Sequence, residues 1–509
     1  MNPESPSEPT RGELIALIKA QAAEIAALKV RIAELERRLG LNSSNSGKPP
    51  SSDGLKKPPR VTSLREPSDK PSGGQKGHKG ETLRQVTEPD RIIDHYPPVC
   101  TACGAAVTPA MSAGHSARQV FDLPEPTPLV VTEHRVHDCR CTSCGARSRA
   151  SFPDEVKAPV QYGPRIAAVV IYLLHYQLLP EDRLAELMAD LFGIRLVAAT
   201  IARMSRTCAA RLQDFVTAVR DLVAGAPVKH MDETGFRIGG QTQWLHVACT
   251  AWLTFYRVCA KRGSLLADVV GIVVHDHWKP YYTMPGVLHA LCNAHHLREL
   301  KALVEIEKED WARKMQQLLR RACHAANLAR EHGIALNTLR PRLHAQFERR
   351  YDAILAQGLA FHQAQSPLVP AATKGKSQRR GRKPRRTGHN LLLRLANRKQ
   401  DVLRFLNDLA VPFTNNQAER DARMMKVKQK ISGGFRCIAG ATDFATIRSF
   451  IATAKKQGWN VIKAIAQEPK VLVNSLSPDT HKASGRASWA VTTRQVGRVP
   501  PRLTALRIS

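Results

Sequence analysis

The residues that decide the fold of this chain are Val228-Lys-His-Met-Asp-Glu-Thr234, a predicted β-strand with a carboxylate at its centre. Two more strands are predicted over residues 244–250 and 253–259, because both segments are rich in β-branched and aromatic residues. A short helix is predicted over residues 265–270. It is followed by a buried strand over residues 271–276, Gly-Ile-Val-Val-His-Asp, which also ends in a carboxylate.

The order of these elements, three strands, a helix and a fourth strand, predicts a ribonuclease-H-like α/β domain. The first and fourth strands of such a sheet are neighbours, so Asp232 and Asp276 can converge although they are far apart in sequence. A third acid must come from a later helix, and the best candidate is Glu419 in Thr414-Asn-Asn-Gln-Ala-Glu-Arg420. Three carboxylates suit two Mg²⁺ ions about 3.5–4 Å apart, which promote in-line displacement at a phosphodiester. Mn²⁺ is an expected substitute for Mg²⁺.

Each of these acids also has a purely structural interpretation. Asp232 could cap a turn, and Asp276 could simply end a strand. Asn416-Gln-Ala-Glu419 has the spacing of a helix N-cap with its reciprocal acid. Taken singly, each structural interpretation is favoured, because structural carboxylates outnumber catalytic ones. Taken together with the strand order and the motifs below, the three acids favour catalysis.

The composition restricts the partners and the location of the protein. The 76 lysine and arginine residues and 44 aspartate and glutamate residues give a net charge of +32, which favours a nucleic-acid partner. The start of the chain lacks the pattern of a signal peptide, and the longest apolar run, residues 166–174, is too short to span a bilayer. We therefore expect a cytoplasmic, nucleoid-associated protein without a membrane partner, whose 11 cysteines are reduced.

Residues 10–40 predict a coiled coil, opened by a capping box of Thr10 and Glu13. Isoleucine and leucine recur in alternating spacings of four and three. Position a of the heptad holds Ile18, Ile25, Ile32 and Leu39, and position d holds Leu14, Gln21, Leu28 and Leu35. Isoleucine at a with leucine at d favours a parallel pair of helices, so a homodimer or higher oligomer is expected. The alternative is an amphipathic helix packed on its own chain.

A linker rich in Pro, Gly, Ser and Lys over residues 41–90 leads to a cysteine module over residues 91–150. The module contains Cys-Thr-Ala-Cys-Gly at 100–104 and Cys-Thr-Ser-Cys-Gly at 141–145. Two such knuckles predict a zinc ribbon with one structural Zn²⁺, because four thiolates complete its tetrahedral shell. The expected ligands are Cys100, Cys103, Cys141 and Cys144, and Cys139 is a fifth cysteine that could replace one of them.

The rest of the chain is predicted to be largely helical around the sheet. A helical domain over residues 155–225 contains two short helices joined near Gly193, which resemble a helix-turn-helix, although plain packing explains them equally well. A catalytic domain is expected over residues 226–475, with a helical insertion at about 297–410 and a disordered tail at 476–509. The fold class is therefore multidomain α+β.

These segments together resemble the transposases of the bacterial insertion-sequence-66 family, from about residue 14 to residue 465. The resemblance rests on the linker motifs NSSNSGKPPSSD and GGQKGHKGETL, the paired knuckles, MDETGF, CNAHHLREL and NNQAERDARMMKVKQKISGGFR. It implies a DDE transposase that binds transposon ends and target DNA and catalyses metal-dependent strand cleavage and strand transfer. Its acids are then Asp232, Asp276 and Glu419, with a helical insertion before the third, and accessory transposition proteins are possible partners.

The same resemblance singles out three more residues. Cys292, His295 and Arg298 match the family's Cys-x-x-His-x-x-Arg string, and either substrate contact or a structural polar cluster explains them. Thr414 departs from the family, which commonly has Asp before the paired Asn.

Two groups of basic residues are candidate contacts to DNA phosphates, which position the nucleic acid without specifying its sequence. They are Arg379, Arg380, Arg382, Lys383, Arg385 and Arg386 in the insertion, and Lys426, Lys428 and Lys430 after the third acid. A solvated basic loop is the alternative for any one of them. Two other functions compete with a transposase: a non-catalytic, zinc-containing DNA-binding protein, and a hydrolytic ribonuclease-H-like nuclease without strand transfer.

Overall fold

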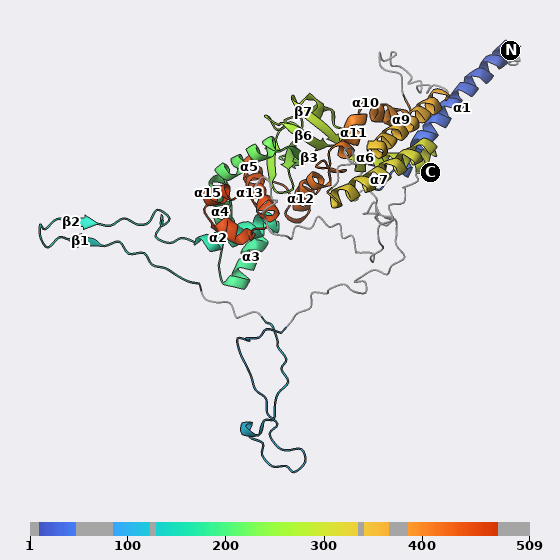
Figure 1. Cartoon of the computed structure of the whole chain (residues 1–509). Coiled ribbons are helices and arrows are strands. Elements are labelled where there is room, and N and C mark those ends of the chain that lie inside the picture. Colours follow the sequence, from blue (N-terminus) through green and yellow to red (C-terminus); the bar gives the residue numbers. More distant parts are fainter. Residues whose placement is uncertain (1–9, 47–84, 123–128, 334–340, 366–384, 477–509) are drawn as a thin grey trace, which may run out of the picture. The chain divides into compact units, whose positions relative to one another are not determined.

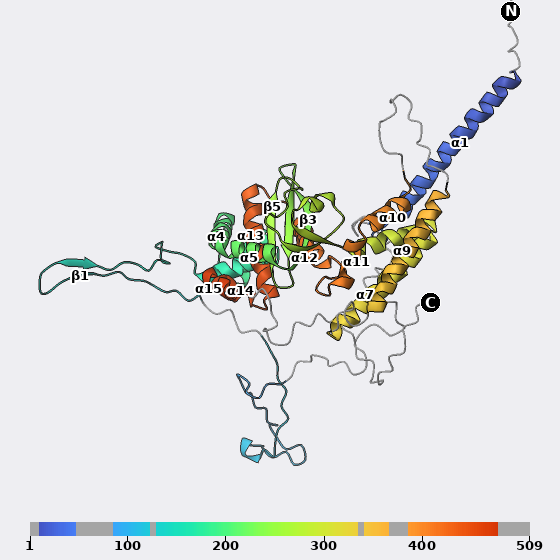
Figure 2. The same cartoon turned by 45° about the horizontal axis from the view of Figure 1, so that its top comes forward.

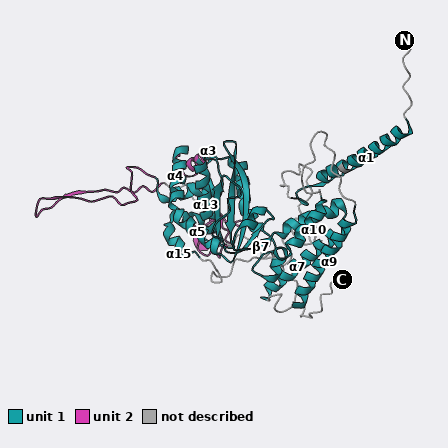
Figure 3. Cartoon of the chain, turned by 90° about the horizontal axis from the view of Figure 1, so that it is seen from above, with its two compact units in different colours: residues 1–54, 162–184, 198–509 teal, residues 55–161, 185–197 magenta. Residues whose placement is uncertain are grey.

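The computed structural model describes residues 10–46, 85–122, 129–333, 341–365 and 385–476. The chain divides into two compact units, which Figure 3 shows in different colours. The large unit comprises residues 1–54, 162–184 and 198–509, and the small unit comprises residues 55–161 and 185–197. The predicted disordered tail and most of the predicted linker lie outside the described residues. No helix among the described residues is both long and apolar enough to cross a membrane.

A five-stranded mixed sheet forms the centre of the large unit, with the strand order β5-β4-β3-β6-β7 (Figures 1 and 2). Strand β3 pairs antiparallel with β4 and parallel with β6, while β4–β5 is antiparallel and β6–β7 is parallel. The strands are β3 (Val228–Ile238), β4 (Gln241–Cys249), β5 (Thr254–Cys259), β6 (Gly271–His275) and β7 (Val287–Leu291). Strand β6 has a strand on each side, in keeping with its continuous apolar run. The four predicted strands are therefore confirmed, and β7 was not predicted.

The helix predicted over residues 265–270 was wrong, because this segment is an irregular connection between β5 and β6. Asp268 has a φ of 58°, a left-handed conformation that a right-handed helix cannot contain. The connection is instead held to β5 by Arg257, whose guanidinium donates to the carbonyl of Leu265 at 2.9 Å. A short apolar sequence alone did not distinguish this loop from a helical turn.

Gly271 opens β6 at a place where the backbone is crowded. Its φ is 77°, and a Cβ atom there would lie 2.6 Å from the carbonyl oxygen of Pro227 and 3.2 Å from that of Ala226. Only glycine fits without moving β6 away from the start of β3.

Helices cover both faces of the sheet. Phe215 of α5 and Phe450 of α13 meet edge to face with ring centroids 4.9 Å apart, in a core that also contains Met231 of β3. On the other face, Ala418 and Met425 of α12 pack in a core with β3 and β4. The covering helices are α2 (Pro164–Ile171), α4 (Ala198–Arg211), α5 (Gln213–Gly225), α12 (Asn416–Ser432), α13 (Ile438–Lys456), α14 (Val461–Ala466) and α15 (Pro469–Asn474). Helix α3 spans Glu181–Phe192.

A buried histidine lies in one of these cores. His175, in the π-helical turn Tyr172–Tyr176 that follows α2, has its Nε2 atom 2.8 Å from the Ser205 hydroxyl of α4. Burial lowers the pKa of His175 to about 3, so the folded protein favours the neutral imidazole.

The segment of the chain between β7 and α12 forms a second set of helices, which packs around Trp311 and Tyr351. They are α6 (Asn293–Ala302), α7 (Asp310–Glu331), α9 (Pro341–Gln363), α10 (Thr387–Asn397) and α11 (Lys399–Asn407), with a π-helical turn at Leu303–Glu307. A polar cluster is buried among them: the carboxylate of Glu309 accepts from Trp311 Nε1 at 2.6 Å and lies 3.3 Å from His362 Nε2. Gly388 of α10 faces this pair, and a Cβ there would lie 2.7 Å from Glu309 Oε1 and 2.8 Å from His362 Nε2.

Helix α1 (Arg11–Gly40) begins with the predicted capping box. Thr10 accepts from the backbone N–H of Glu13, and the Glu13 carboxylate accepts from that of Thr10. The apolar seam predicted for the coiled coil is exposed in the single chain, with Ile18 63% and Ile25 53% exposed. Apart from its last turn, where Gly40 approaches Ile306, this seam is therefore available to another helix.

Candidate active site

The register of β3 and β6 gives the first two candidate acids equivalent positions on two central strands, at the carboxyl end of β6. His230 pairs with Val274 across the parallel ladder, and Asp232 and Asp276 each lie two residues further along their segments. Asp232 Oδ1 accepts from the Glu233 N–H at 2.9 Å, and Asp276 Oδ1 accepts from the Trp278 N–H at 3.0 Å. Two carboxylates at equivalent positions of neighbouring strands form the basis of the site.

The third candidate acid, Glu419, lies in the first turn of α12, but not as a capping acid. The N-cap of α12 is Asn415, whose backbone carbonyl accepts from the Glu419 N–H at 3.2 Å. The capping box considered for Asn416 and Glu419 is therefore absent. The Glu419 carboxylate instead lies 3.6 Å from Cys292 Sγ and 3.7 Å from His295 Nδ1.

Asn415 ties α12 to the strand that carries the first acid. Its side-chain amide donates to the carbonyl of Met231 at 2.7 Å, and its side-chain oxygen lies 2.9 Å from His230 Nδ1. Its own N–H donates to Cys292 Sγ at 3.1 Å, at the point where β7 passes into α6. A single buried residue therefore connects β3, α6 and α12 next to Asp232 and Glu419.

The electrostatics of the acids fit a divalent cation. Asp232 is closely surrounded by protein atoms, and burial raises its pKa to about 8, with the charges of Glu233, Glu419 and Asp276 adding to the effect. Burial also raises the pKa of Asp276, and Glu233 contributes. Carboxylates that repel one another in this way can all ionise near neutral pH when a cation neutralises them, and their hard oxygens suit Mg²⁺.

Glu233, beside Asp232, has a structural role that the sequence did not reveal. Its buried carboxylate accepts from Arg262 Nε at 2.8 Å and from the Tyr281 hydroxyl at 2.6 Å. The Arg262 guanidinium also lies over two indole rings, 4.1 Å from the centroid of Trp278 and 5.1 Å from that of Trp244.

A cleft of about 340 Å³ opens beside Asp276. It is lined by Arg262, Asp276, His277, Trp278, Leu291, Cys292, His295, His296, Glu299 and Arg394. Cys292 and His295 also form, with Glu419, the one group of three potential metal ligands among the described residues whose ligand atoms all lie within 4.8 Å of one another. The Cys292 and His295 side chains therefore connect the second acid with the third.

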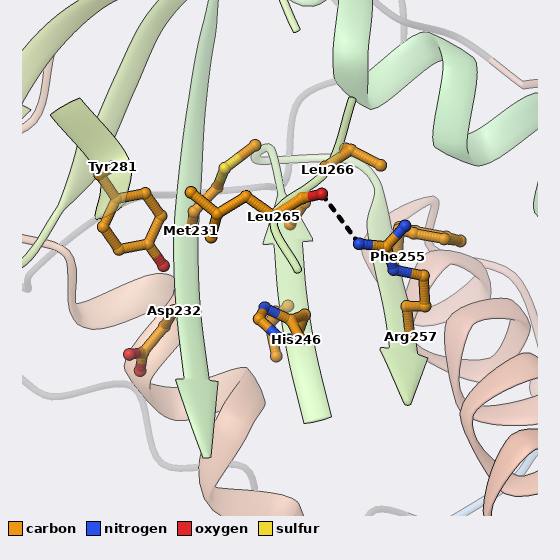
Figure 4. Close-up of a pocket in the computed structure, with 10 residues that line it drawn as sticks. Met231, Asp232, His246, Phe255, Arg257, Leu265, Leu266 and Tyr281 are labelled. Carbon is orange, nitrogen blue, oxygen red and sulfur yellow. Dashed lines mark hydrogen bonds between the residues drawn. The ribbon is translucent and has the colours of Figure 1, made fainter. Parts of the chain in front are cut away.

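A much smaller cavity of about 10 Å³ is lined by Asp232, Met231 and Tyr281 (Figure 4). Figure 4 shows the Tyr281 ring beside the Asp232 carboxylate, and its dashed line marks the hydrogen bond from Arg257 to the Leu265 carbonyl. This volume holds about one water molecule and is too small for a nucleotide.

The two cysteine knuckles of the small unit have the same local geometry. In each, the N–H of the glycine after the second cysteine donates to the carbonyl of the first cysteine at 2.9 Å, and Gly104 and Gly145 both have a φ of 73°. Backbone N–H groups lower the pKa of Cys100 and of Cys141, which favours the thiolates that bind metal. All four candidate ligands are described, but their sulfur atoms do not all gather within 4.8 Å, so the shared zinc site stays a prediction.

The candidate DNA-binding residues are divided by the structure into several groups. Arg379, Arg380, Arg382 and Lys383 lie outside the described residues, Arg385 is exposed, and Arg386 immediately precedes α10. Lys430 is exposed, and the exposed Lys426 donates to the carbonyl of Gly235. Lys428 is half-buried, with its ammonium 3.2 Å from the Gly433 carbonyl and 4.2 Å from the centroid of the Phe435 ring. Of the three lysines, Lys426 and Lys430 are therefore the more accessible.

Comparison with known families identifies the family of the chain. A family model described as transposase IS66 family matches residues 159–443, which is more than half of the chain and includes all three acids. The protein is therefore a transposase, an enzyme that acts on DNA. It belongs to the IS66 family of transposases.

The beginning of the chain matches a second family. Residues 2–84 match a model described as a family of unknown function (DUF6444), which includes α1. No curated protein matches the chain.

Proposed function

We propose that this transposase is a DDE enzyme whose Asp232, Asp276 and Glu419 bind two Mg²⁺ ions in a ribonuclease-H-like domain. The observation that carries the proposal is the pairing of β3 with β6, which gives Asp232 and Asp276 equivalent positions at the carboxyl end of β6. Glu419 lies close enough for its charge to raise the pKa of Asp232. The strand order β5-β4-β3-β6-β7, in which β4 alone runs opposite to the other four strands, supports the assignment of the fold.

Mg²⁺ bound at these carboxylates would activate the attacking oxygen and stabilise the leaving oxygen, and Mn²⁺ is expected to substitute. The protein's own contribution is to hold the acids in place. Asn415 fixes the start of α12 against β3, and the Glu233 carboxylate anchors Arg262 at the edge of the cleft. His295, beside Glu419, has its pKa lowered chiefly by burial, so a neutral imidazole is available next to the acids.

The proposal extends to the rest of the transposition reaction. A 3′-hydroxyl freed by strand cleavage would replace water at the same site, which gives strand transfer into target DNA. The exposed seam of α1 supports a homodimer or higher oligomer, and the paired knuckles support a structural Zn²⁺ at Cys100, Cys103, Cys141 and Cys144. Lys426, Lys430 and the basic residues of the insertion would contact DNA phosphates, and accessory transposition proteins and a nucleoid-associated location accord with this activity.

The experiment that tests the proposal compares Glu419→Gln with the wild type in Mg²⁺-dependent cleavage of DNA that carries the ends of the element encoding the chain. Gln keeps the shape of the side chain and can still accept from Cys292, but it loses the charge. Because even residues that only orient metal ligands contribute about 10–100-fold, we expect cleavage to fall by at least about 100-fold. Glu331→Gln, at the exposed end of α7, is the matched control and should cleave normally.

Each result of this comparison distinguishes between functions. Unchanged cleavage by Glu419→Gln would refute the assignment of the active site. A wild type that binds these ends without cutting them would favour the non-catalytic DNA-binding protein. A wild type that cuts, but does not join a pre-cut 3′-hydroxyl end to target DNA, would favour the hydrolytic nuclease.

A further inference from the structure

The cleft beside Asp276 contains two arginines from different parts of the fold. Arg262 lies in the loop after β5, and Arg394 lies on α10 in the helical insertion, yet both line the same 340 Å³ cleft. A volume near the lower end of the range for small-ligand pockets, about 300–1,000 Å³, suits one unit of a single DNA strand rather than a duplex.

Arg262 is oriented before any ligand arrives. The Glu233 carboxylate accepts from Arg262 Nε and Nη2, and the two indole rings limit the rotation of its guanidinium. The other terminal nitrogen, Nη1, has no hydrogen-bond partner among the described residues, and 38% of the side chain is exposed. Arginine held in this way can donate to a phosphate oxygen at a small cost in side-chain entropy.

Arg394 is likewise paired with a glutamate, and one of its buried nitrogens has no hydrogen-bond acceptor among the described residues. Its Nη2 pairs with Glu299, while its buried Nε has no hydrogen-bond partner in the described structure. His295 Nδ1, on the same cleft, is also buried without a hydrogen-bond partner among the described residues. A buried donor left unpaired costs about 1–3 kcal/mol, so a ligand oxygen at this point would be bound favourably.

We propose that this cleft is a phosphate-binding subsite, in which Arg262 and Arg394 hold a DNA backbone phosphate next to the scissile bond. The subsite rests on the proposed function, because it takes the DNA strand that Asp232, Asp276 and Glu419 would cut. Repulsion between DNA and these acids has to be offset close by, and two oriented guanidinium groups do so. The helical insertion thereby contributes a substrate-binding residue to the site.

The test is a double-mutant cycle between protein and DNA. A set of end DNAs is prepared, each with a single neutral methylphosphonate at one position flanking the cleavage site. Binding is measured with Ca²⁺ in place of Mg²⁺, so that the DNA is bound without being cut. We expect Arg394→Gln to weaken binding to natural DNA roughly tenfold, as for the loss of a charge-assisted hydrogen bond. At one or two positions the methylphosphonate should weaken wild-type binding but cause no further loss in Arg394→Gln.

Matched variants make the result specific. Arg349→Gln, an exposed arginine of α9, removes the same charge from the insertion and should be additive with the methylphosphonate at every position. Arg394→Lys keeps the charge but loses the planar fork, so it should show a partial effect if Arg394→Gln does not fold. Arg262→Lys should likewise show a partial loss of coupling to the methylphosphonate.

Additivity at every flanking position for both Arg262 and Arg394 variants would overturn the subsite, even if the three acids prove to be catalytic. Coupling at one phosphate together with unchanged cleavage by Glu419→Gln would retain the subsite and reject the proposed active site. The failure of one proposal is therefore distinguishable from the failure of the other.

Discussion

Replacing Asn415 by Ala tests whether one buried amide fixes the geometry of the candidate site. Asn415 is 1% exposed, and its side chain connects α12 to the backbone of Met231 and to the ring of His230. Alanine removes both connections and leaves the backbone bond to Cys292 in place. The next residue, Asn416, is exposed on the same turn, so Asn416→Ala is a matched control.

The expected cost follows from the contacts. Each lost hydrogen bond contributes about 0.5–1.5 kcal/mol net, and a buried group left unpaired adds to this, so the free energy of unfolding should fall by about 2–4 kcal/mol. Urea unfolding followed by tryptophan fluorescence measures it, because the tryptophans of the described residues all lie in the large unit: Trp244, Trp252, Trp278, Trp311 and Trp459. Asn416→Ala should stay within about 0.5 kcal/mol of the wild type.

The same variant should change the metal dependence of cleavage. If Asn415 positions Glu419 for metal binding, the Mg²⁺ concentration for half-maximal cleavage should rise by about 10–100-fold, as for other residues that orient metal ligands. A purely structural role would lower stability and leave this concentration unchanged. Equal stability of Asn415→Ala and Asn416→Ala, or an unchanged Mg²⁺ dependence, would refute the reasoning.

Three further predictions concern stability and assembly. Gly388→Ala should destabilise the helical insertion by about 1–3 kcal/mol in urea unfolding, because its methyl group would overlap a buried carboxylate and imidazole. Gly440→Ala, in the first turn of α13, should be neutral or stabilising, because a Cβ there would lie 3.7 Å from the nearest atom. Equal effects of Gly388→Ala and Gly440→Ala on stability would contradict the packing argument. The lowered pKa of His175 means that the stability contributed by its neutral form is complete above pH 6.5 and is lost as the pH falls toward 3. The wild type should therefore lose about 1.4 kcal/mol per pH unit more than His175→Gln below pH 6.5, and parallel pH profiles would be evidence against this. Ile25→Lys in the seam of α1 should shift the protein toward monomer in sedimentation equilibrium while Ala26→Lys does not, and an unaffected assembly would exclude this seam as the interface.

Local patterns in the sequence were sufficient to predict the strands that carry Asp232 and Asp276. The buried run Gly-Ile-Val-Val-His before Asp276 predicts a strand that ends at this acid, and the order of the predicted strands then predicts that Asp232 lies close to it. The helix predicted at 265–270 and the missed strand β7 show the limit of such patterns. Residues 265–270 and β7 are both short apolar segments. Whether such a segment forms a strand or a loop depends on the neighbouring strand with which it can pair.

The supporting residues could not be predicted, because their partners are distant in sequence. Glu233 meets Arg262 and Tyr281 only after the sheet has formed, and Asn415 reaches back to β3. The MDET motif could have directed attention to Glu233 as a second acid beside Asp232. Nothing local distinguishes Arg394 from the other basic residues of the insertion.

The crowding at Gly271 has a consequence for how this enzyme tolerates variation. The glycine lies five residues before Asp276, at the opposite end of β6, and touches no residue of the candidate site. Any side chain there must push β6 away from Pro227, and a short strand held on both sides shifts as a unit. The carboxylate at its far end then moves relative to Asp232. Natural copies with a substitution at position 271 should therefore lose activity while still producing folded protein. The spacing of the acids thus depends on a residue that takes no part in the chemistry.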